Sequence, residues 1–460
     1  MWSSKVGVRS QVSRMPRMCA FSQVHRHNSG YQSIGSFHSE NPEFLLRIPH
    51  SSYQPPTLPF QCDHELDMSD FMLEKRWTFL NHGAFGASLS CAYRRAEQWR
   101  LYLEQQPLRY FDRDLLPHLV YTTRRLAQFL ETSPTNLALL SNVTAGLNAV
   151  IKGFSTHNAQ GKIVLWETSY GSVKKMARTY HCPDRVHEIS FLKEMEHNNS
   201  SSEIVCYALQ EFLSGDGDWS NALLIVDHTA SNTAINFPVQ QLATIAKNHG
   251  MIVCVDGAHG LLAQPVHSVL PHVDIYLSNG HKWMSCPRGV ALLYCASKEL
   301  RERILRVPAV VSHGIDDGFF NRFVWDGTRD YAAALAVPAA LDYWETQGPS
   351  NVCARMRSTL TQAVELLADM WHDGDMQRAT LADMQVHSPM ALVRLPSPVS
   401  VGTSNDAKQV QDFLFHHSIE VPIKSVLGNL YVRLSCHVYN ELHEYERLGN
   451  VMLQHSQSIL

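Results

Sequence analysis

The sequence lacks a strong charge of either sign, a long apolar run and any closely paired cysteines. Its 39 Lys and Arg against 43 Asp and Glu leave a formal net charge of −4 over 460 residues. A general nucleic-acid-binding protein needs a basic excess to offset phosphate charge, and that excess is missing. No run approaches the ~18 apolar residues that span a bilayer; the longest candidate, Ala332 to Leu341, is short and contains Pro338. We therefore expect neither nucleic acid nor a membrane as a partner.

The ten cysteines are scattered, and no CxxC motif occurs among them. Cys254 and Cys295 lie inside apolar runs, which is typical of buried thiols in an intracellular protein and argues against a disulfide framework. The 25 histidines form neither an HExxH motif nor a Cys/His ladder. The sequence therefore predicts no metal site.

Acidic residues are also missing from the N-terminus, because the first one is Glu40. Residues 1–39 are rich in serine and contain five Lys or Arg: Lys5, Arg9, Arg14, Arg17 and Arg26. An Arg-rich and Ser-rich start without acids is typical of an organellar transit peptide. This composition indicates a mitochondrial protein; a disordered tail on a cytoplasmic protein is the alternative.

From about Phe71 the sequence contains short apolar runs that alternate with helical patterns. The runs that read as strands are Leu137–Leu140, Ile163–Trp166, Ala222–Val226, Met251–Val255, Asp274–Leu277 and Val290–Tyr294. Stretches between them, such as Val239–His249, have apolar residues at helical spacing. Apolar strands that alternate with helices predict an α/β fold with a largely parallel, doubly wound sheet.

We predict four segments along the chain. After about Ala340 the pattern changes to long amphipathic stretches around Met390–Leu395 and Leu430–Leu434, as in a smaller α+β domain. The segments are a transit peptide with a disordered linker (1–70), an N-terminal segment that packs with the small domain (71–110), a large domain (111–340) and a small C-terminal domain (341–460).

Two candidate sites follow predicted strands, where ligands gather in open α/β sheets. Thr144 and Ala145 begin a predicted helix, whose free backbone N–H groups suit a phosphate; an ordinary capped helix is the alternative. Asp256 comes directly after an apolar strand. Its carboxylate would pair with a cationic ring nitrogen or, alternatively, cap the next helix.

Two further segments carry a lysine and an anion-binding turn. Lys282 lies between His281 and Trp283 after a predicted strand. A nucleophilic lysine needs a depressed pKa, which desolvation or cationic neighbours provide; a loop lysine with its ammonium in solvent is the alternative. Gly327 and Thr328 offer an amide and a hydroxyl to an anion, although alone they read as an ordinary turn.

Together these segments resemble the class V aminotransferase family of fold-type I pyridoxal-phosphate (PLP) enzymes. The resemblance extends from the Asn-His-Gly opening at Asn81 to the Arg-Leu-Ser segment at Arg433, more than three quarters of the chain. The Asn-Gly-His-Lys-Trp and Trp-Asp-Gly-Thr-Arg-Asp segments are most similar to the isopenicillin-N-epimerase-like and cysteine-desulfhydrase-like branch. The 26-residue step from Asp256 to Lys282 also suits the family. The resemblance implies a large PLP-binding domain and a smaller C-terminal domain.

The resemblance also implies roles for single residues around the cofactor ring. Lys282 would form a Schiff base with PLP and, once released, move the Cα proton, while Asp256 would keep the pyridine nitrogen protonated. His259 would contact the phenolic oxygen of the ring, and Ser231 would lie near that oxygen. Tyr170 would stack on the ring face.

For the phosphate and the substrate, the resemblance implies two more groups of residues. The phosphate cup would contain Thr144, Ala145, Asn279 and His281. Thr328 would reach the phosphate of a neighbouring subunit, which implies a homodimer with a shared active site. Arg433 would hold the carboxylate of a small amino-acid substrate with its bidentate guanidinium. Asn81 and His82 would line the substrate entrance.

The fold does not fix the reaction. A cysteine desulfurase needs a mobile nucleophilic cysteine shortly before the carboxylate-binding arginine, but no cysteine occurs between Cys353 and Cys436. A β-elimination needs only Lys282, a coenzyme ring that accepts electrons and a residue that binds the substrate carboxylate. A thiolate is also a good leaving group. We therefore favour PLP-dependent β-elimination from L-cysteine or a cysteine conjugate.

Other functions stay open as alternatives. An epimerase would need a second acid or base on the opposite face of the ring, for which His82 and Tyr170 are the candidates. A transaminase is another alternative. A non-catalytic scaffold with this fold is disfavoured, because Lys282 and Asp256 are both present.

Overall fold

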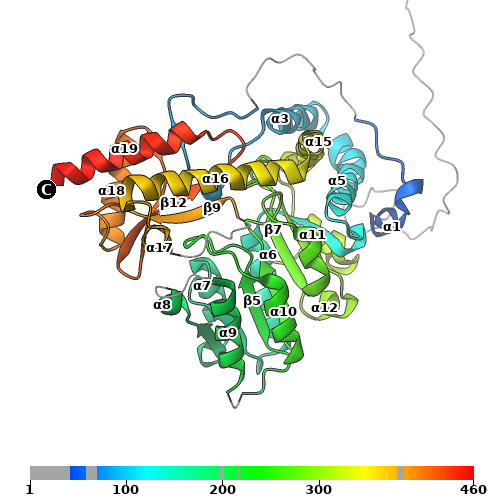
Figure 1. The fold of residues 1–460 in the computed structure, drawn as a ribbon. Coiled ribbons are helices and arrows are strands. Elements are labelled where there is room, and N and C mark those ends of the chain that lie inside the picture. Colours follow the sequence, from blue (N-terminus) through cyan, green and yellow to red (C-terminus); the bar gives the residue numbers. More distant parts are fainter. Residues whose placement is uncertain (1–41, 59–69, 196–200, 216, 382–387, 460) are drawn as a thin grey trace, which may run out of the picture.

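The computed structural model describes residues 42–58, 70–195, 201–215, 217–381 and 388–459. In Figure 1 the large sheet, which includes β5 and β7, lies below the long helix α16, and a smaller unit with β9, β12 and α19 lies at one end of that helix. The predicted transit peptide, residues 1–39, lies outside the described residues. No helix in the described ranges is both long and apolar enough to cross a bilayer.

The large sheet has seven strands in the order β2, β8, β7, β6, β5, β3, β4. Their bounds in that order are Leu137–Leu140, Ala291–Cys295, Ile275–Asn279, Ile252–Asp256, Leu223–Asp227, Ile163–Trp166 and Val186–Ile189. Parallel pairing joins β4, β3, β5, β6 and β7, and β8 pairs antiparallel with both of its neighbours. The predicted α/β fold with a largely parallel sheet is confirmed.

Helices cover both faces of this sheet, so each face has its own core. On β6, Val253 and Val255 contribute to one hydrophobic cluster, and the alternate side chains, Ile252 and Cys254, contribute to the other. Burial on both faces explains why the strands are continuously apolar. The helices with residues in the first cluster include α5 (Leu115–Phe129), α9 (Ser201–Leu213) and α10 (Val239–Asn248), and those in the second include α6 (Val143–His157), α7 (Gly171–Tyr180), α12 (Lys298–Arg303) and α13 (Phe319–Val324).

The C-terminal part contains an antiparallel sheet of three strands in the order β11 (Ile423–Val426), β12 (Asn429–Ser435), β9 (Met390–Arg394). Helices α16 (Pro349–His372), α18 (Ser404–His416) and α19 (Leu442–Ile459) contribute with it to a third hydrophobic cluster. The apolar segments Met390–Leu395 and Leu430–Leu434 correspond to β9 and β12, and their bounds differ by one residue.

The N-terminal segment contacts both parts. Strand β1 (Thr78–Phe79) pairs in parallel with β10 (Ile419–Glu420) of the C-terminal part, whereas α3 (Ser90–Gln105) packs against α14 (Ala332–Leu335) and α15 (Val337–Gln347). The limits of the four predicted segments stay a prediction. The remaining α-helices are α1 (Pro42–Arg47), α2 (His82–Phe85), α4 (Pro107–Arg109), α8 (Leu192–Met195), α11 (Val266–Val269) and α17 (Met376–Ala379), with a π-helical turn at Tyr110–Asp114.

The prediction of a disordered linker up to residue 70 is wrong for α1. This helix packs against α5, and Leu46 is buried. Arg124 of α5 donates hydrogen bonds to the carbonyl oxygens of Leu45, Leu46 and Ile48, at 3.0, 3.1 and 2.8 Å. These carbonyls end a helix and have no partners within it, so the guanidinium satisfies them. A short apolar stretch and a partner far along the chain order this segment.

Candidate active site

The carboxyl ends of three neighbouring strands bring the candidate residues together. Asp227 ends β5, Asp256 ends β6 opposite it in the register, and Asn279 ends β7. Because β5, β6 and β7 are parallel, their carboxyl ends lie at the same edge of the sheet. Lys282 follows three residues after β7, and His259 follows β6. The structure therefore places the predicted lysine, carboxylate and histidine at one sheet edge.

Lys282 and His259 are in direct contact. Nζ of Lys282 lies 3.1 Å from Nε2 of His259, and the Nε1–H of Trp283 donates to Nδ1 of the same ring at 3.2 Å. Because Nδ1 accepts, the neutral ring carries its proton on Nε2 and presents it to the amine. Burial, with Lys282 and Arg433 adding to it, holds the pKa of His259 well below its ordinary value. The contact therefore suits a neutral imidazole that donates to a neutral amine.

The electrostatic surroundings of Lys282 favour that neutral amine. The pKa of its ammonium is lowered to about 8, because burial and, to a smaller extent, Arg433 lower it by more than Asp256 raises it. Charging this amine in a desolvated site costs free energy that a surface lysine does not meet. The alternative of a loop lysine with its charge in solvent is therefore excluded, and the amine has the property that a nucleophile needs.

Asp256 is buried beside a second carboxyl group. Its Oδ1 accepts a hydrogen bond from the N–H of Ala258 at 3.0 Å. Burial raises the pKa of Asp256, while that N–H and Lys282 lower it. Burial and the charge of Asp256 raise the pKa of Asp227 well above its ordinary value. Two buried carboxyl groups side by side favour a bound cation, so this edge of the sheet suits a protonated ring nitrogen.

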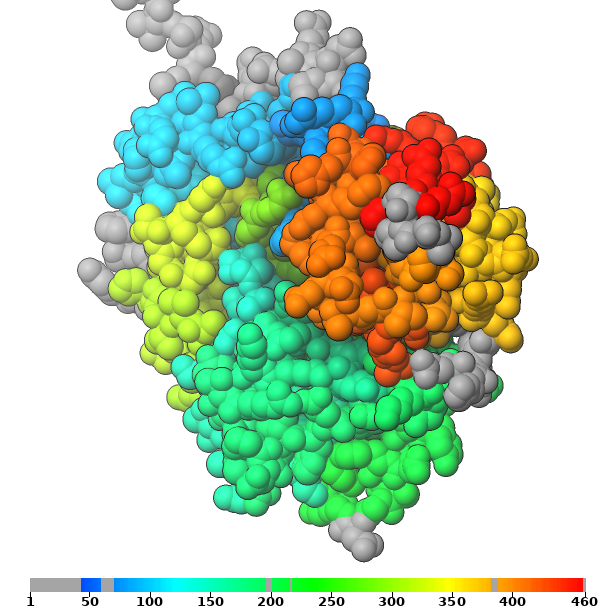
Figure 2. All heavy atoms as spheres, turned by 90° about the vertical axis from the view of Figure 1, so that its left-hand side faces the viewer, coloured from blue at the N-terminus to red at the C-terminus, as the bar shows by residue number. Residues whose placement is uncertain are grey.

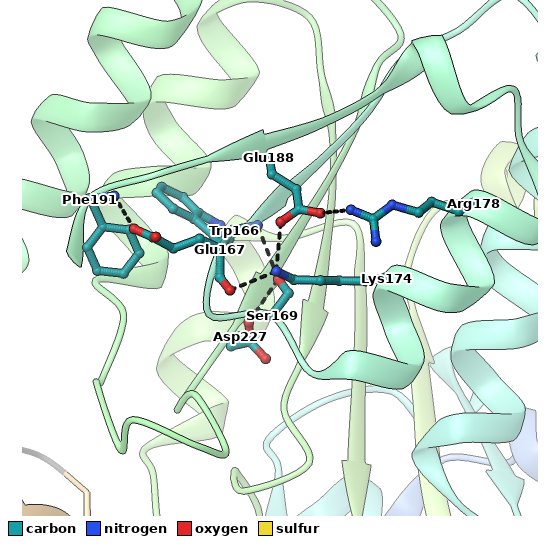
Figure 3. A network of polar contacts seen from close by, with 8 residues as sticks. All are labelled: Trp166, Glu167, Ser169, Lys174, Arg178, Glu188, Phe191 and Asp227. Carbon is teal, nitrogen blue, oxygen red and sulfur yellow. Dashed lines mark hydrogen bonds and ion pairs between the residues drawn. The ribbon is translucent and has the colours of Figure 1, made fainter. Parts of the chain in front are cut away.

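A network of polar contacts holds the loop that carries Tyr170 (Figure 3). Nζ of Lys174 donates to the carbonyl oxygen of Glu167 and to Oε2 of Glu188, both at 2.7 Å. Ser169 Oγ accepts from the N–H of Trp166 at 3.1 Å and donates to Oδ2 of Asp227 at 3.2 Å. The loop is therefore fixed to the carboxyl pair.

Tyr170 and Thr168 are the residues of this loop that are suited to a ligand. Tyr170 has 47 % of its surface exposed and interacts electrostatically with Arg433. Thr168 is buried, and its hydroxyl has no hydrogen-bond partner among the described residues. A buried hydroxyl without a partner is costly, which makes Thr168 a candidate that the sequence reasoning missed.

The start of α6 differs in part from the predicted phosphate cup. Oδ1 of Asn279 accepts a hydrogen bond from the N–H of Val143 at 3.1 Å, so this predicted residue does lie at the helix start. However, Oδ1 of Asn142 accepts from the N–H of Ala145 at 2.8 Å. The predicted free N–H of Ala145 is therefore wrong in this structure, because Asn142 is an N-cap whose side chain occupies it.

The other two residues of the predicted cup lie in different surroundings. Thr144 is exposed in the first turn of α6. His281 is half-buried, and its Nδ1 has no partner among the described residues. Burial lowers the pKa of His281 to about 4. A neutral imidazole with a free nitrogen suits hydrogen bonding to a ligand.

Arg433 on β12 is held in place from two sides. Nη2 donates to Oδ1 of Asn81 at 3.0 Å, and Nη1 donates to the carbonyl oxygen of Ser231. Asn81 in turn donates from Nδ2 to Oε1 of Glu420 at 3.0 Å. Nε of Arg433 is buried and has no partner among the described residues. Asn81 thus positions the guanidinium, and Ser231 contacts the arginine through its backbone.

The expectation that His82 lines the substrate entrance is wrong. Its ring is fully buried, Nε2 lies 3.0 Å from the carbonyl oxygen of Lys282, and Nδ1 lies 2.9 Å from the hydroxyl of Tyr439. The ring also stacks on that of His437, with centroids 4.0 Å apart. His82 therefore supports the backbone of the lysine from behind.

Glycine explains why the Asn-His-Gly segment packs so closely on this backbone. Gly86 has a φ of +69°, and a Cβ there would lie 1.9 Å from the carbonyl oxygen of His281. Only glycine permits both this conformation and this approach. The Asn-His-Gly-Ala-Phe-Gly segment is thus a packing element of the lysine loop.

Thr328 lies in a separate turn. In that turn the hydroxyl of Tyr331 donates to the carbonyl oxygen of Gly327 at 2.7 Å, and Arg329 is paired with Asp326. No hydrogen bond among the described residues joins Thr328 to Lys282 or Asp256. Its proposed contact with a phosphate needs a second subunit and stays a prediction.

The residues at this sheet edge fit PLP. The fit rests on a buried amine with a lowered pKa, a carboxyl pair suited to a ring cation, and an exposed aromatic face. The unpaired hydroxyl of Thr168 and the free Nδ1 of His281 add donors and acceptors.

Comparisons with known proteins identify the family of the chain. A family model described as aminotransferase class-V matches residues 118–372, more than half of the chain. L-cysteine desulfhydrase of Arabidopsis thaliana is 27 % identical over 403 residues, which cover 82 % of this chain and 87 % of the relative. Isopenicillin N epimerase of Streptomyces clavuligerus is 27 % identical over 415 residues, which cover 85 % and 98 %.

Solved structures share the fold. The cystine C–S lyase C-DES, in complex with its reaction product cysteine persulfide, has a TM-score of 0.64 at 19 % identity and covers 82 % of this chain and 97 % of its own. A cysteine desulfurase from Thermococcus onnurineus NA1 has a TM-score of 0.65 at 18 % identity, with 85 % and 97 % covered. The predicted fold-type I architecture is therefore confirmed. The chain belongs to the aminotransferase class-V family, and it is a PLP-dependent enzyme.

Proposed function

We propose that the enzyme is a carbon–sulfur lyase that acts on L-cysteine or a cysteine conjugate by β-elimination. The observation that carries the proposal is the buried amine of Lys282, which has a pKa of about 8 and lies 3.1 Å from His259. The sequence from 354 to 435, which leads to Arg433, contains no cysteine. The relatives named L-cysteine desulfhydrase support the same reaction.

Each residue of the site has a separate role in the proposed elimination. PLP supplies an aldehyde for the substrate amine and a ring that withdraws electrons from Cα. Arg433 binds the α-carboxylate. Nζ of Lys282 would hold the coenzyme and would accept the proton from Cα of the substrate. The Cβ–S bond breaks, and the sulfur leaves with the bonding pair as a thiolate, so that hydrolysis of the released aminoacrylate gives pyruvate and ammonia.

The position of the cysteines argues against persulfide transfer. A desulfurase needs a mobile thiol close before the arginine, and the sequence from 354 to 435 contains none. Cys436 comes directly after β12, is buried, and burial raises the pKa of its thiol to about 12. A buried, protonated thiol is a poor nucleophile.

Epimerisation is the second candidate, because isopenicillin N epimerases are among the relatives. It needs an acid on the ring face opposite Lys282. Both nitrogens of His82 are occupied behind the lysine backbone, so His82 does not provide that acid. Tyr170 is the candidate that stays open.

Product analysis tests the choice. The enzyme loaded with PLP (the loaded enzyme) is incubated with L-cysteine, or with an S-substituted cysteine, in deuterated water. We expect pyruvate, ammonia and the free thiol or sulfide in equal amounts. Alanine with a persulfide would replace the proposal with desulfuration, and deuterium at Cα of intact, racemised substrate would replace it with epimerisation. The variant Lys282→Ala is the control that must form none of these products.

A further inference from the structure

One face of the small antiparallel sheet is directed toward the site and carries positive charge. Alternate residues of β12 divide between the two faces. Leu430, Val432 and Leu434 belong to the core of the C-terminal part, whereas Tyr431 belongs to the cluster of the large sheet. Arg433 is on the face of Tyr431. This face therefore looks toward the large domain and the residues around Lys282.

Lys424 of β11 lies on the same face as Arg433. The register pairs Lys424 with Tyr431, and Arg433 is two residues further along β12. Such diagonal neighbours have Cα atoms roughly 7–8 Å apart. Val426, the next residue of β11 on this face, is buried in the cluster of the large sheet. Lys424 is half-buried beside the arginine anchor.

The face carries three cationic side chains and no acid. Its residues are Met390, Leu392 and Arg394 on β9, Asn429, Tyr431, Arg433 and Ser435 on β12, and Lys424 and Val426 on β11. In the part of the chain that the structure describes, no carboxylate forms an ion pair with Arg394, Lys424 or Arg433. Nη2 of Arg394 donates to Oδ1 of Asn429 at 2.6 Å.

Of these three cations, Lys424 is the one that has no hydrogen-bond partner in the described part of the chain. Among the described residues no hydrogen bond satisfies its ammonium. Burial, and then the charge of Arg433, lower its pKa. Three titratable groups from other elements, Lys282, His259 and Tyr170, interact electrostatically with Arg433. Glu420 is the carboxylate nearby, and it accepts a hydrogen bond from Asn81, which in turn contacts Arg433. A partly buried charge without a counter-ion costs free energy, so the position suits an anion brought in by a ligand.

We propose that the substrate carries a second anionic group on its sulfur substituent and that Lys424 binds this group while Arg433 binds the α-carboxylate. The proposal rests on the proposed function and names its substrate class: S-substituted cysteines that end in a carboxylate. L-cysteine itself has one carboxylate, which satisfies Arg433 alone. Figure 2 shows the surface hollowed between the orange C-terminal part of the chain and its yellow-green and teal parts.

A matched pair of substrates tests the proposal. S-carboxymethyl-L-cysteine and its amide, S-carbamidomethyl-L-cysteine, are nearly equal in size and differ in charge. We expect the loaded wild-type enzyme to prefer the acid over the amide by about tenfold or more in kcat/KM, since a charged hydrogen bond contributes at least that factor. In Lys424→Met this ratio should fall close to one, and in Lys424→Arg it should be largely kept.

Binding separates this proposal from the proposed reaction. The dissociation constants of both compounds are measured with the PLP-loaded enzyme by stopped-flow absorption of the coenzyme, whose binding phase precedes turnover. Tighter binding of the acid, lost in Lys424→Met, supports the subsite even if no pyruvate forms, and in that case the lyase reaction alone is refuted. Equal binding of acid and amide in wild type, or an unchanged preference in Lys424→Met, overturns the subsite. Lys298→Met, at an exposed position on α12, is the matched control and should keep the wild-type ratio.

Discussion

Lys282 is a buried amine whose reactivity depends on its protonation. We expect the rate at which the cofactor-free protein binds PLP to increase with pH, because only the neutral amine attacks an aldehyde. The rise should have its midpoint near pH 8 and level off above it, since the pKa of Lys282 is lowered to about 8 from 10.5. Stopped-flow absorption of the bound cofactor measures this rate.

The control for this measurement is Lys282→Ala, which should show no Schiff-base absorption and no trapping by borohydride. A midpoint near pH 10 would mean that the amine is as exposed as an ordinary lysine. That result would contradict the burial on which the site rests.

Arg433 provides the second test at the scale of one side chain. Because its fork is held by Asn81 and Ser231 before any substrate arrives, we expect Arg433→Met to raise KM for L-cysteine by about tenfold or more, the value of a charged hydrogen bond. The kcat of Arg433→Met should change less, because Arg433 binds the carboxylate equally in the ground state and in the transition state. A fall in kcat with KM unchanged would contradict simple anchoring.

Residue types and spacing predicted part of this site and missed the rest. Asp256, His259 and Lys282 are close in sequence and follow strands, so their meeting follows from the parallel sheet. Tyr439 contacts His82, and His437 contacts the backbone of Trp283, each from more than 150 positions further along the chain. No local pattern indicates these contacts. The family resemblance implied a place at the substrate entrance for His82, whereas contacts with Tyr439 and His437 bury its ring.

Among the elements, α2 acts as a short support for the lysine loop. We expect His82→Ala to lower the free energy of unfolding by about 2–4 kcal/mol, because it removes a fully buried ring and leaves the carbonyl of Lys282 and the hydroxyl of Tyr439 without partners. Tyr439→Phe removes one hydroxyl and should cost about 1–2 kcal/mol. Urea unfolding of the loaded enzyme measures both values.

The loaded Tyr439→Phe enzyme should also keep its cofactor absorption, since that change leaves the contact between His82 and Lys282 in place. An unfolding free energy of His82→Ala equal to that of wild type would show that α2 does not support the loop.

The strands were easier to predict than the edges of the fold. Strands buried on both faces are continuous apolar runs, and those predictions agree within one or two residues. The sequence analysis missed strand β4 because the strand lies at the sheet edge and is only partly buried. It contains the polar residues His187 and Glu188, so it is not a continuous apolar run. Helix α1 was missed because its six residues are ordered by contacts with α5, not by an amphipathic pattern of useful length.

For the whole molecule, the prediction of a homodimer is tied to Thr328. We expect sedimentation to give a mass twice the 52.0 kDa of the chain. Thr328→Val should weaken retention of PLP, because the lost hydroxyl serves the phosphate of the other subunit. Dialysis followed by absorption measures this retention.

Mixed dimers identify the subunit that is affected. In hybrids of Thr328→Val with Lys282→Ala, the site that keeps Lys282 faces the intact Thr328 of the other subunit and should hold PLP as tightly as wild type. A monomeric loaded enzyme, or a hybrid as weak as the Thr328→Val homodimer, would contradict the shared site.

The adjacent carboxyl groups at the ends of β5 and β6 have a consequence for the life of the protein in a cell. When no cation is bound beside them, the burial of these two carboxyl groups lowers the free energy of unfolding. The cationic ring of a bound coenzyme reduces this cost. Because a ligand that binds only the folded state stabilises it by mass action, the amount of intact enzyme should follow vitamin B6 supply. Scarcity of the vitamin would then expose newly made chains to proteolysis before they ever meet a substrate.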